Sequence, residues 1–149
     1  MRLRFGLVLL SSLLVLPVAC GGGDSGDSDA SAGVGELADA ADSDRSVEVE
    51  ALDTLRFDPA DIEVSVGETI TFSVTNAGDL EHEFVIGSEE DAMAAHEGSM
   101  GHGEGSLVLD GGASDEVAWT FTEAGELDFA CYIDGHNEAG MKGTILITE

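Results

Sequence analysis

From residue 46 to the C-terminus, apolar and polar residues alternate in short runs. The positions that share a face include Ile62, Val64 and Val66; Ile70, Phe72 and Val74; His82, Phe84 and Ile86; Val117, Trp119 and Phe121; and Leu127, Phe129 and Cys131. Turn-forming segments such as SVGET, NAGD, DGGASD and EAGE separate the runs. Alternation with a period of two between turns is typical of β-strands that bury one face. The pattern predicts an all-β fold, an antiparallel Greek-key β-sandwich of about seven to eight strands.

The same alternation orients two chemically reactive side chains. His82 shares a face with Phe84, and Cys131 shares a face with Phe129. Because alternate side chains of a strand point to opposite faces, His82 and Cys131 are both expected to point into the sandwich. Each also lies at one end of its strand. A histidine and a cysteine that face the core at strand ends can meet.

The N-terminal residues follow a different pattern. MRLRF carries two arginines and precedes the apolar run GLVLLSSLLVLPVAC, which ends at Cys20. A basic start followed by a short apolar core predicts a secretory signal peptide over residues 1–19, and the run is short for a membrane span. The ending LPVAC resembles a bacterial lipoprotein signal, in which Cys20 would be lipidated. Such signals usually have Leu where this chain has Pro17, so plain secretion stays open as the alternative.

Residues 20–45 are mostly Gly, Ser, Asp and Ala. This composition offers almost nothing to bury and predicts a flexible, self-repelling acidic linker. A lipid on Cys20 would make the linker a tether that holds the domain of residues 46–149 at an extracytoplasmic membrane surface, periplasmic or on the cell surface. The alternative is the disordered N-terminus of a freely secreted protein.

The chain is strongly acidic, with 31 acidic and 5 basic residues and a formal net charge of −26. Such a surface repels the phosphates of nucleic acid, which excludes nucleic acid as a partner. It can steer the protein towards redox partners with basic docking surfaces, or concentrate cations. A general acidic surface suited to high salt is the alternative, and charge alone does not decide between them.

The segment CYIDGHNEAGM places Cys131, His136 and Met141 at intervals of five residues. A copper ion that cycles between Cu(I) and Cu(II) suits two imidazoles, a thiolate and a weak thioether. The segment supplies three of these donors, and His82 supplies the fourth. Each residue alone is more often structural, since a buried Cys commonly acts as a small hydrophobe. Their coincidence favours copper, and a single thiolate with Met is a poor set for zinc.

These residues resemble those of the cupredoxins, the type 1 blue copper proteins such as plastocyanin, azurin and rusticyanin. The resemblance covers about residues 46–149 and rests on NAGDLEHEF, on the C-x4-H-x4-M pattern and on GMKGTILI. The spacing is closest to the rusticyanin type. The resemblance implies one type 1 copper ion with two kinds of ligand, equatorial His82, Cys131 and His136 and axial Met141. Glu83 departs from the family pattern, because several members have Asn after the first His.

A second group of Met and His lies in MAAHEGSMGH, within an acidic, Gly-rich insertion at about residues 88–105. Its donors are Met93, His96, Met100 and His102. Thioethers and imidazoles bind both oxidation states of copper, which favours a second, looser and weaker copper site. A flexible solvated loop with incidental Met and His is an equally weighted alternative.

Two function classes remain. In the first, the protein is an extracytoplasmic, monomeric one-electron carrier that exchanges electrons with redox partners through His136 and contacts the membrane only by its lipid. In the second, it binds copper for tolerance or delivery, with residues 93–102 as a second site. An enzyme is disfavoured because a four-ligand site leaves no place for substrate. The complete ligand set argues against a metal-free adhesion domain.

Overall fold

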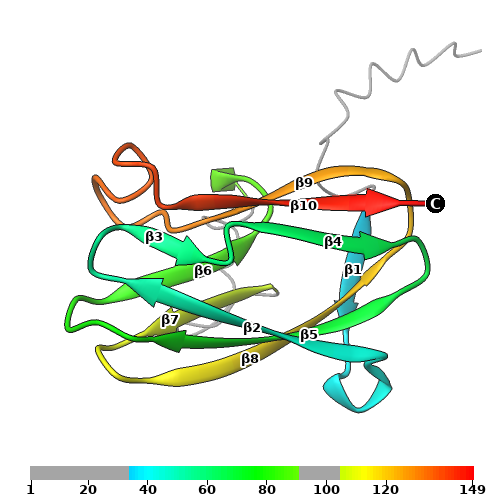
Figure 1. The fold of residues 1–149 in the computed structure, drawn as a ribbon, viewed down its shortest axis with the longest axis horizontal. Coiled ribbons are helices and arrows are strands. Elements are labelled where there is room, and N and C mark those ends of the chain that lie inside the picture. The colour runs from blue at the N-terminus through cyan, green and yellow to red at the C-terminus, as the bar shows by residue number, and fades with distance from the viewer. Residues whose placement is uncertain (1–33, 91–104) are drawn as a thin grey trace, which may run out of the picture.

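The computed structural model describes residues 34–90 and 105–149 of the 149-residue chain and shows two five-stranded sheets packed as a sandwich (Figure 1). The first sheet, in spatial order, contains β1 (Gly35–Ala38), β8 (Ser114–Phe121), β5 (Thr69–Asn76), β2 (Arg45–Leu52) and β3 (Arg56–Asp58). The second contains β4 (Asp61–Ser65), β10 (Lys142–Thr148), β9 (Gly125–Ala130), β6 (His82–Ile86) and β7 (Ser106–Leu109). A short 3-10 helix, η1, spans Ala40–Asp42. Within the described part, no helix has the length and apolar character needed to cross a membrane.

The predicted all-β sandwich is confirmed, and two details differ from the prediction. The described residues form ten strands rather than seven or eight, because β1 and β3 contain too few residues to show a period. Two strand pairs, β2 with β5 and β4 with β10, are parallel rather than antiparallel. Alternation along one strand tells which face is buried but not the direction of the neighbouring strand.

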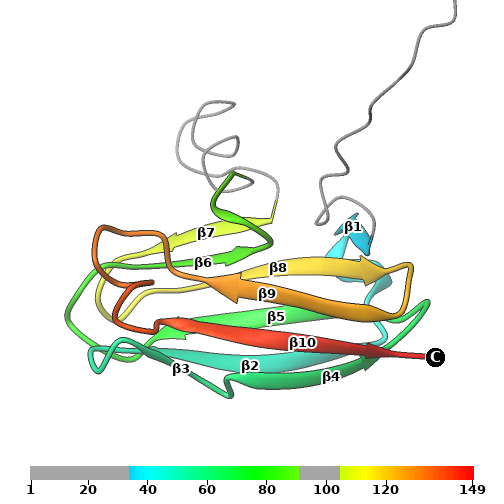
Figure 2. The same ribbon diagram turned by 90° about the horizontal axis from the view of Figure 1, so that it is seen from above.

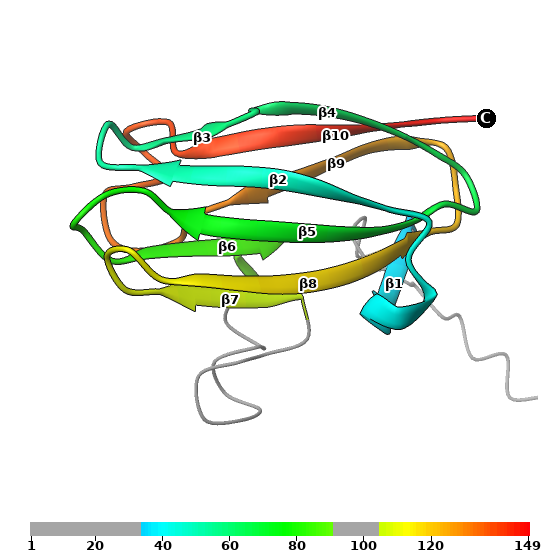
Figure 3. The same ribbon diagram turned by 60° about the horizontal axis from the view of Figure 1, so that its bottom comes forward.

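The folded chain begins earlier than the boundary predicted at residue 46. Strand β1 lies beside β8 (Figure 3). The two strands pair antiparallel, with Gly35 opposite Phe121. A side chain at Gly35 would collide with the indole of Trp119, so only glycine permits this close approach. The prediction of a flexible linker is therefore wrong from Gly35 onward. The predicted signal peptide, Cys20 and the rest of the linker lie outside the described residues.

The predicted inward faces meet in a core of aromatic rings. Phe72, Phe84, Phe121 and Phe129 are all fully buried. The rings of Phe84 and Phe129 lie 5.1 Å apart, centroid to centroid. Burying an aromatic or large aliphatic side chain stabilises the fold by about 1.5–3 kcal/mol. Because these rings lie on β5, β6, β8 and β9, they hold the two sheets rigidly together.

Strand pairing brings the two inward-facing reactive residues to one end of the sandwich. Strands β6 and β9 are antiparallel neighbours, with Val85 opposite Ala130. The start of β6, at His82, and the end of β9, before Cys131, therefore lie at the same edge. The loop between β9 and β10 folds over this end, whereas β1 and the C-terminus lie at the opposite end (Figure 2).

Candidate metal centre

The loop between β9 and β10 is shaped by tight turns. The N–H of His136 donates to the carbonyl oxygen of Ile133 (2.9 Å), and the N–H of Gly140 donates to that of Asn137 (2.8 Å). Gly135 and Gly140 have φ angles of +83° and +98°. This left-handed region strains any residue with a Cβ, so both turns depend on glycine. The segment that carries the three predicted ligands therefore folds into a compact loop.

Backbone hydrogen bonds fasten the predicted ligands of this loop to one another. The N–H of Met141 donates to the carbonyl oxygen of His136 (3.0 Å), and the N–H of Cys131 donates to that of Met141 (3.0 Å). Arg56 Nη1 donates to the carbonyl oxygen of Ala139 (2.8 Å) and ties the loop to β3. Met141 and Cys131 are both fully buried. The loop therefore presents its sulfur side chains inward from a fixed backbone.

The segment before His82 is held by a buried amide. Asn76 is fully buried at the end of β5. Its Nδ2 donates to the carbonyl oxygens of Leu80 (2.6 Å) and Leu109 (2.9 Å), and its Oδ1 accepts from the N–H of Gly78 (3.0 Å). These bonds satisfy polar groups that would otherwise be buried without partners. They also fix the turn NAGDLE that delivers His82 to the start of β6.

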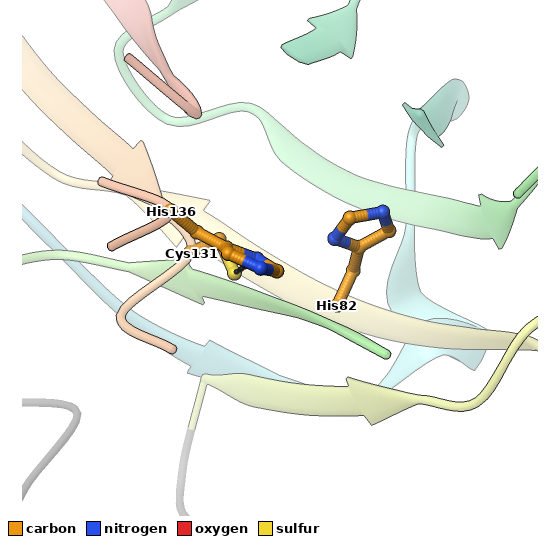
Figure 4. A group of neighbouring side chains, drawn as sticks. All are labelled: His82, Cys131 and His136. Carbon is orange, nitrogen blue, oxygen red and sulfur yellow. Dashed lines mark hydrogen bonds between the residues drawn. The ribbon is translucent and has the colours of Figure 1, made fainter. Parts of the chain in front are cut away.

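Three predicted ligands meet at this end of the sandwich (Figure 4). The Sγ of Cys131 lies 3.3 Å from Nδ1 of His136, and the rings of His82 and His136 are 5.3 Å apart, centroid to centroid. One ligand atom from each of His82, Cys131 and His136 lies within 4.8 Å of the others. The alternation and the loop spacing therefore predicted correctly that these three side chains converge.

The donor atoms fit a transition-metal ion. Both ring nitrogens of His82 are buried, and neither has a hydrogen-bond partner among the described residues. An orphaned buried polar group costs about 1–3 kcal/mol, which a metal bond would offset. Bonds of about 2.0 Å to nitrogen and about 2.3 Å to sulfur, at tetrahedral angles, separate two donors by about 3.5 Å. The observed 3.3 Å between Cys131 Sγ and His136 Nδ1 is close to this separation.

Burial disfavours the charged forms of His82 and Cys131 in the metal-free protein. Burial lowers the pKa of His82, with a further lowering from His136, while the carboxylate of Asp53 acts in the opposite direction. Burial also raises the pKa of the Cys131 thiol, against hydrogen bonds from the backbone of Glu83 and Ile133 that lower it. At neutral pH the metal-free centre therefore holds an uncharged imidazole and a protonated thiol. A metal ion must displace the thiol proton when it binds.

Two acidic residues beside the ligands were missed by sequence reasoning. Asp53 Oδ1 lies 3.7 Å from His82 Nε2, and its carboxylate accepts from the N–H groups of Asp79 and Leu80, which lowers its pKa. Glu83 follows the inward-facing His82 on β6, yet it too is only 2 % exposed. All five residues of β6 are buried. The departure of Glu83 from the family pattern was the only hint in the sequence.

The structure describes only one of the remaining predicted site residues, Met141. Met141 is fully buried, and its backbone is hydrogen-bonded to the backbones of Cys131 and His136. The second predicted group, Met93, His96, Met100 and His102, lies outside the described residues, as does Cys20. Cys131 carries a free thiol.

Comparisons with known proteins agree with this geometry. Residues 43–148 match the model of the copper-binding proteins of the plastocyanin/azurin family. The chain is 44% identical over 126 residues to the copper-resistant cuproprotein CopI of Rubrivivax gelatinosus, covering 80% of this chain and 76% of the relative. It is 33% identical to the CopI of Pseudomonas aeruginosa over 175 residues, covering 94% of this chain and 96% of the relative.

Solved structures with the same fold include auracyanin B, with a TM-score of 0.63 and 20% identity over 78% of this chain and 97% of that one. Auracyanin A, a blue copper protein from Chloroflexus aurantiacus, has a TM-score of 0.56 and 21% identity over 69% of this chain and 98% of that one. At these identities the likeness concerns the fold. The family match, which covers most of the chain, together with the converging His82, Cys131 and His136, shows that the chain belongs to the plastocyanin/azurin family of copper-binding proteins.

Proposed function

We propose that the chain is an extracytoplasmic type 1 copper protein that contributes to copper tolerance. The observation that carries the proposal is the preformed group of His82, Cys131 and His136, in which the buried ring nitrogens of His82 make no hydrogen bond to the described residues. Met141, buried beside them in the sequence pattern of an axial ligand, would complete the set. Copper bound there would supply one-electron exchange between Cu(I) and Cu(II).

The residues of the chain contribute three things to this role. Cys131 would release its proton and offer a thiolate to a bound ion, and the imidazoles of His82 and His136 would offer nitrogen ligands. Burial of Cys131 and His82 excludes water from the donors. The hydrogen bonds of Asn76 and of the ligand loop hold the donors in one arrangement, so that little rearrangement accompanies a change of oxidation state.

The relatives favour tolerance over other uses of such a centre. Two proteins that this chain matches over most of its length carry the name copper-resistant cuproprotein. The insertion at about residues 88–105 adds four Met and His donors to the sequence. We propose these as a second, weaker copper site that captures ions.

The type 1 centre is tested by adding Cu(II) to the purified metal-free protein. We expect one tightly bound ion and an intense visible band from charge transfer between thiolate and copper. Cys131→Ser should lose the band. Its absence from the wild type, or its persistence in Cys131→Ser, would contradict the type 1 centre.

Tolerance is tested in the source organism. Loss of the gene should lower the copper concentration at which cells grow, and the wild-type gene should restore growth. Deleting residues 93–102 should lower the copper stoichiometry and give partial restoration. Unchanged stoichiometry and full restoration by this deletion would rule out the second site.

A second candidate function, one-electron transfer to a redox partner, is favoured by a surface feature. An open hollow of about 570 Å³ lies beside the ligand loop and is lined by residues that include Glu89, Glu126 and Asp128. Tyr132 and Asn137, which directly follow two ligands in the sequence, also line it. A basic partner docked there would lie close to the copper. Rapid electron exchange with a basic redox protein that slows steeply with salt would support this function, whereas salt-independent exchange would oppose it.

We further propose that Cys20 is lipidated and that the protein is anchored outside the cytoplasm. The ending LPVAC of the predicted signal supports this location. Cys20→Ala should move the protein from the membrane fraction to the soluble extracytoplasmic fraction. Recovery of both wild type and variant in the soluble extracytoplasmic fraction would show that the protein is secreted without an anchor.

A further inference from the structure

The β2–β3 turn, residues 53–56, contacts both segments that carry the proposed copper ligands. One is the ligand loop between β9 and β10, and the other is the segment 77–81 that leads to His82. The turn lies between these two segments at one end of the sandwich (Figure 1). Its two charged side chains, Asp53 and Arg56, each extend to one of them. The turn therefore connects parts of the site that are distant in the sequence.

Asp53 holds the segment before His82. Its Oδ1 accepts from the N–H groups of Asp79 and Leu80, both at 3.0 Å. Successive N–H groups that converge in this way form a cradle for an oxygen atom. The carboxylate lies against Gly78, where a Cβ would collide with Oδ1. The same oxygen lies 3.7 Å from Nε2 of His82. Asp53 therefore fixes this segment at the residues directly before the ligand.

Arg56 holds the ligand loop. Its Nη1 donates to the carbonyl oxygen of Ala139 in the loop (2.8 Å) and to that of Leu55 in the turn (2.6 Å). One nitrogen atom therefore joins the two backbones. The guanidinium lies against Gly140, where a Cβ would come within 3.2 Å of Nη1. Because Gly140 directly precedes Met141, Arg56 holds the loop next to a proposed ligand.

The turn between these two side chains has an unusual and firmly held backbone. Leu55 has a φ angle of +57°, in the left-handed region that residues with a Cβ rarely adopt. Such a conformation persists only where the surrounding structure holds it. The N–H of Leu55 donates to the carbonyl oxygen of Leu52 (2.9 Å), and the Leu55 side chain packs against the core. The turn is therefore a stiff connection between Asp53 and Arg56.

We propose that the β2–β3 turn is a clamp that sets the rate of copper release, with Asp53 and Arg56 as its positioning residues. The proposal rests on the copper centre proposed above. For copper to leave, His82 and the ligands of the loop must separate. A clamp on both segments keeps each ligand at a high effective concentration, so a ligand that lets go binds again before the ion escapes. Because the clamp needs both side chains, losing either one should have nearly the same effect as losing both.

Release is measured by transferring copper from the loaded protein to an excess of a strong chelator. Asp53 and Arg56 are exposed, so their variants should fold. A net hydrogen bond changes an equilibrium about fivefold, so Asp53→Ala and Arg56→Ala should each release copper about fivefold faster. The double variant should stay within about twofold of the faster single variant, whereas independent side chains would give the product, about 25-fold. Asp53→Asn keeps an oxygen that accepts from both N–H groups and should restore release to within about twofold of the wild-type rate.

Matched control variants lie at the other end of β2. Asp44 Oδ2 accepts from the N–H of Thr69 (2.9 Å), and Arg45 Nη2 donates to the carbonyl oxygen of Glu63 (2.9 Å). A carboxylate and a guanidinium thus bind backbone groups there too, on the order of 25 Å from the clamp along the strand. Asp44→Ala and Arg45→Ala should leave copper release within about twofold of the wild-type rate.

A second measurement needs no metal. In the metal-free protein, Arg56→Ala should speed hydrogen exchange at the Leu80 amide, which is bonded to Asp53. Asp53→Ala should likewise speed exchange at the Met141 amide, in the ligand loop. Rates are compared with that of the Phe72 amide in the core, which corrects for a general loss of stability. A side chain that acts only through its own hydrogen bond would leave the distant amide unchanged.

The outcomes separate the clamp from the copper centre. A wild type that binds no copper overturns the centre and the role in release, whereas exchange at the two distant amides still shows whether the turn joins the segments. With copper bound, a single variant that releases at the wild-type rate overturns the clamp, as does a double variant more than about twofold faster than either single variant. Asp53→Asn that releases as fast as Asp53→Ala would assign the effect to charge and overturn positioning by hydrogen bonds. Unchanged exchange at both distant amides overturns the coupling through the turn.

Discussion

Replacing Asn76 by Ala should weaken both the fold and the copper site, because one buried amide holds the segment that delivers His82. Asn76 is fully buried, and its side chain makes three hydrogen bonds, to the backbone of Leu80, Leu109 and Gly78, at 2.6–3.0 Å. A hydrogen bond of this kind contributes about 1 kcal/mol. We therefore expect Asn76→Ala to lower the free energy of unfolding of the metal-free protein by about 3 kcal/mol.

The loss should be measured by urea unfolding, with the slope m compared between variants to confirm that the change lies in stability. Copper affinity should fall as well, because His82 is no longer held at the start of β6. Thr75→Ala is the matched control. The Thr75 hydroxyl bonds Ser114 Oγ (2.8 Å) at an exposed site, and we expect a loss below about 1 kcal/mol, typical of surface substitutions.

A free energy of unfolding of Asn76→Ala within about 1 kcal/mol of the wild-type value, together with equal copper affinity, would refute this role of the buried amide. The amide would then be replaceable by water at no cost. A stability loss of about 3 kcal/mol with unchanged copper affinity would show that the fold depends on Asn76 but that His82 is positioned by other contacts.

Three further predictions follow from the same contacts. Burial lowers the pKa of His82 below its ordinary 6.5, so below about pH 6.5 the unfolded state takes up a proton that the folded state does not, and the metal-free protein should lose stability. Chemical unfolding at about pH 7.5 to 5 should show a free energy of unfolding that falls with pH, and His82→Leu should reduce this dependence. Arg56→Ala removes a hydrogen bond to the ligand loop and should speed copper release to a chelator, with an unchanged rate counting against this role. Gly35→Val should detach β1 from Trp119 and shift tryptophan fluorescence to longer wavelength. Gly125→Ala, whose Cβ would make only an ordinary contact with Val34, should leave the spectrum unchanged.

Much of the metal centre could be predicted because its determinants are local. Cys131, His136 and Met141 lie on one loop, and glycines in that loop permit the turns that bring them together. The inward direction of His82 follows from alternation with Phe84, since side chains two apart share a face of a strand. These patterns do not depend on which strands pair, so they can be recognised in the sequence alone.

Two acidic neighbours of the centre could not be predicted in the same way. Asp53 lies in the turn after β2, and its approach to His82 depends on how the β2–β3 turn packs against the segment before β6. Glu83 has the outward position of its strand, and only the covering of the outer face of β6 buries it. Both environments are set by segments distant in the sequence.

The sequence by itself determined the all-β fold, the inward face of each strand and the candidate ligands, because these follow from the period of two and from residue chemistry. The tertiary structure alone decided the parallel pairs, the addition of β1 to the first sheet and the burial of Glu83 against Cys131. The physical reason is that hydrogen-bond pairing and burial are properties of two or more segments in contact. The candidate copper ligands can be identified from the sequence, whereas the charged groups that surround them are placed by the packing of the sandwich.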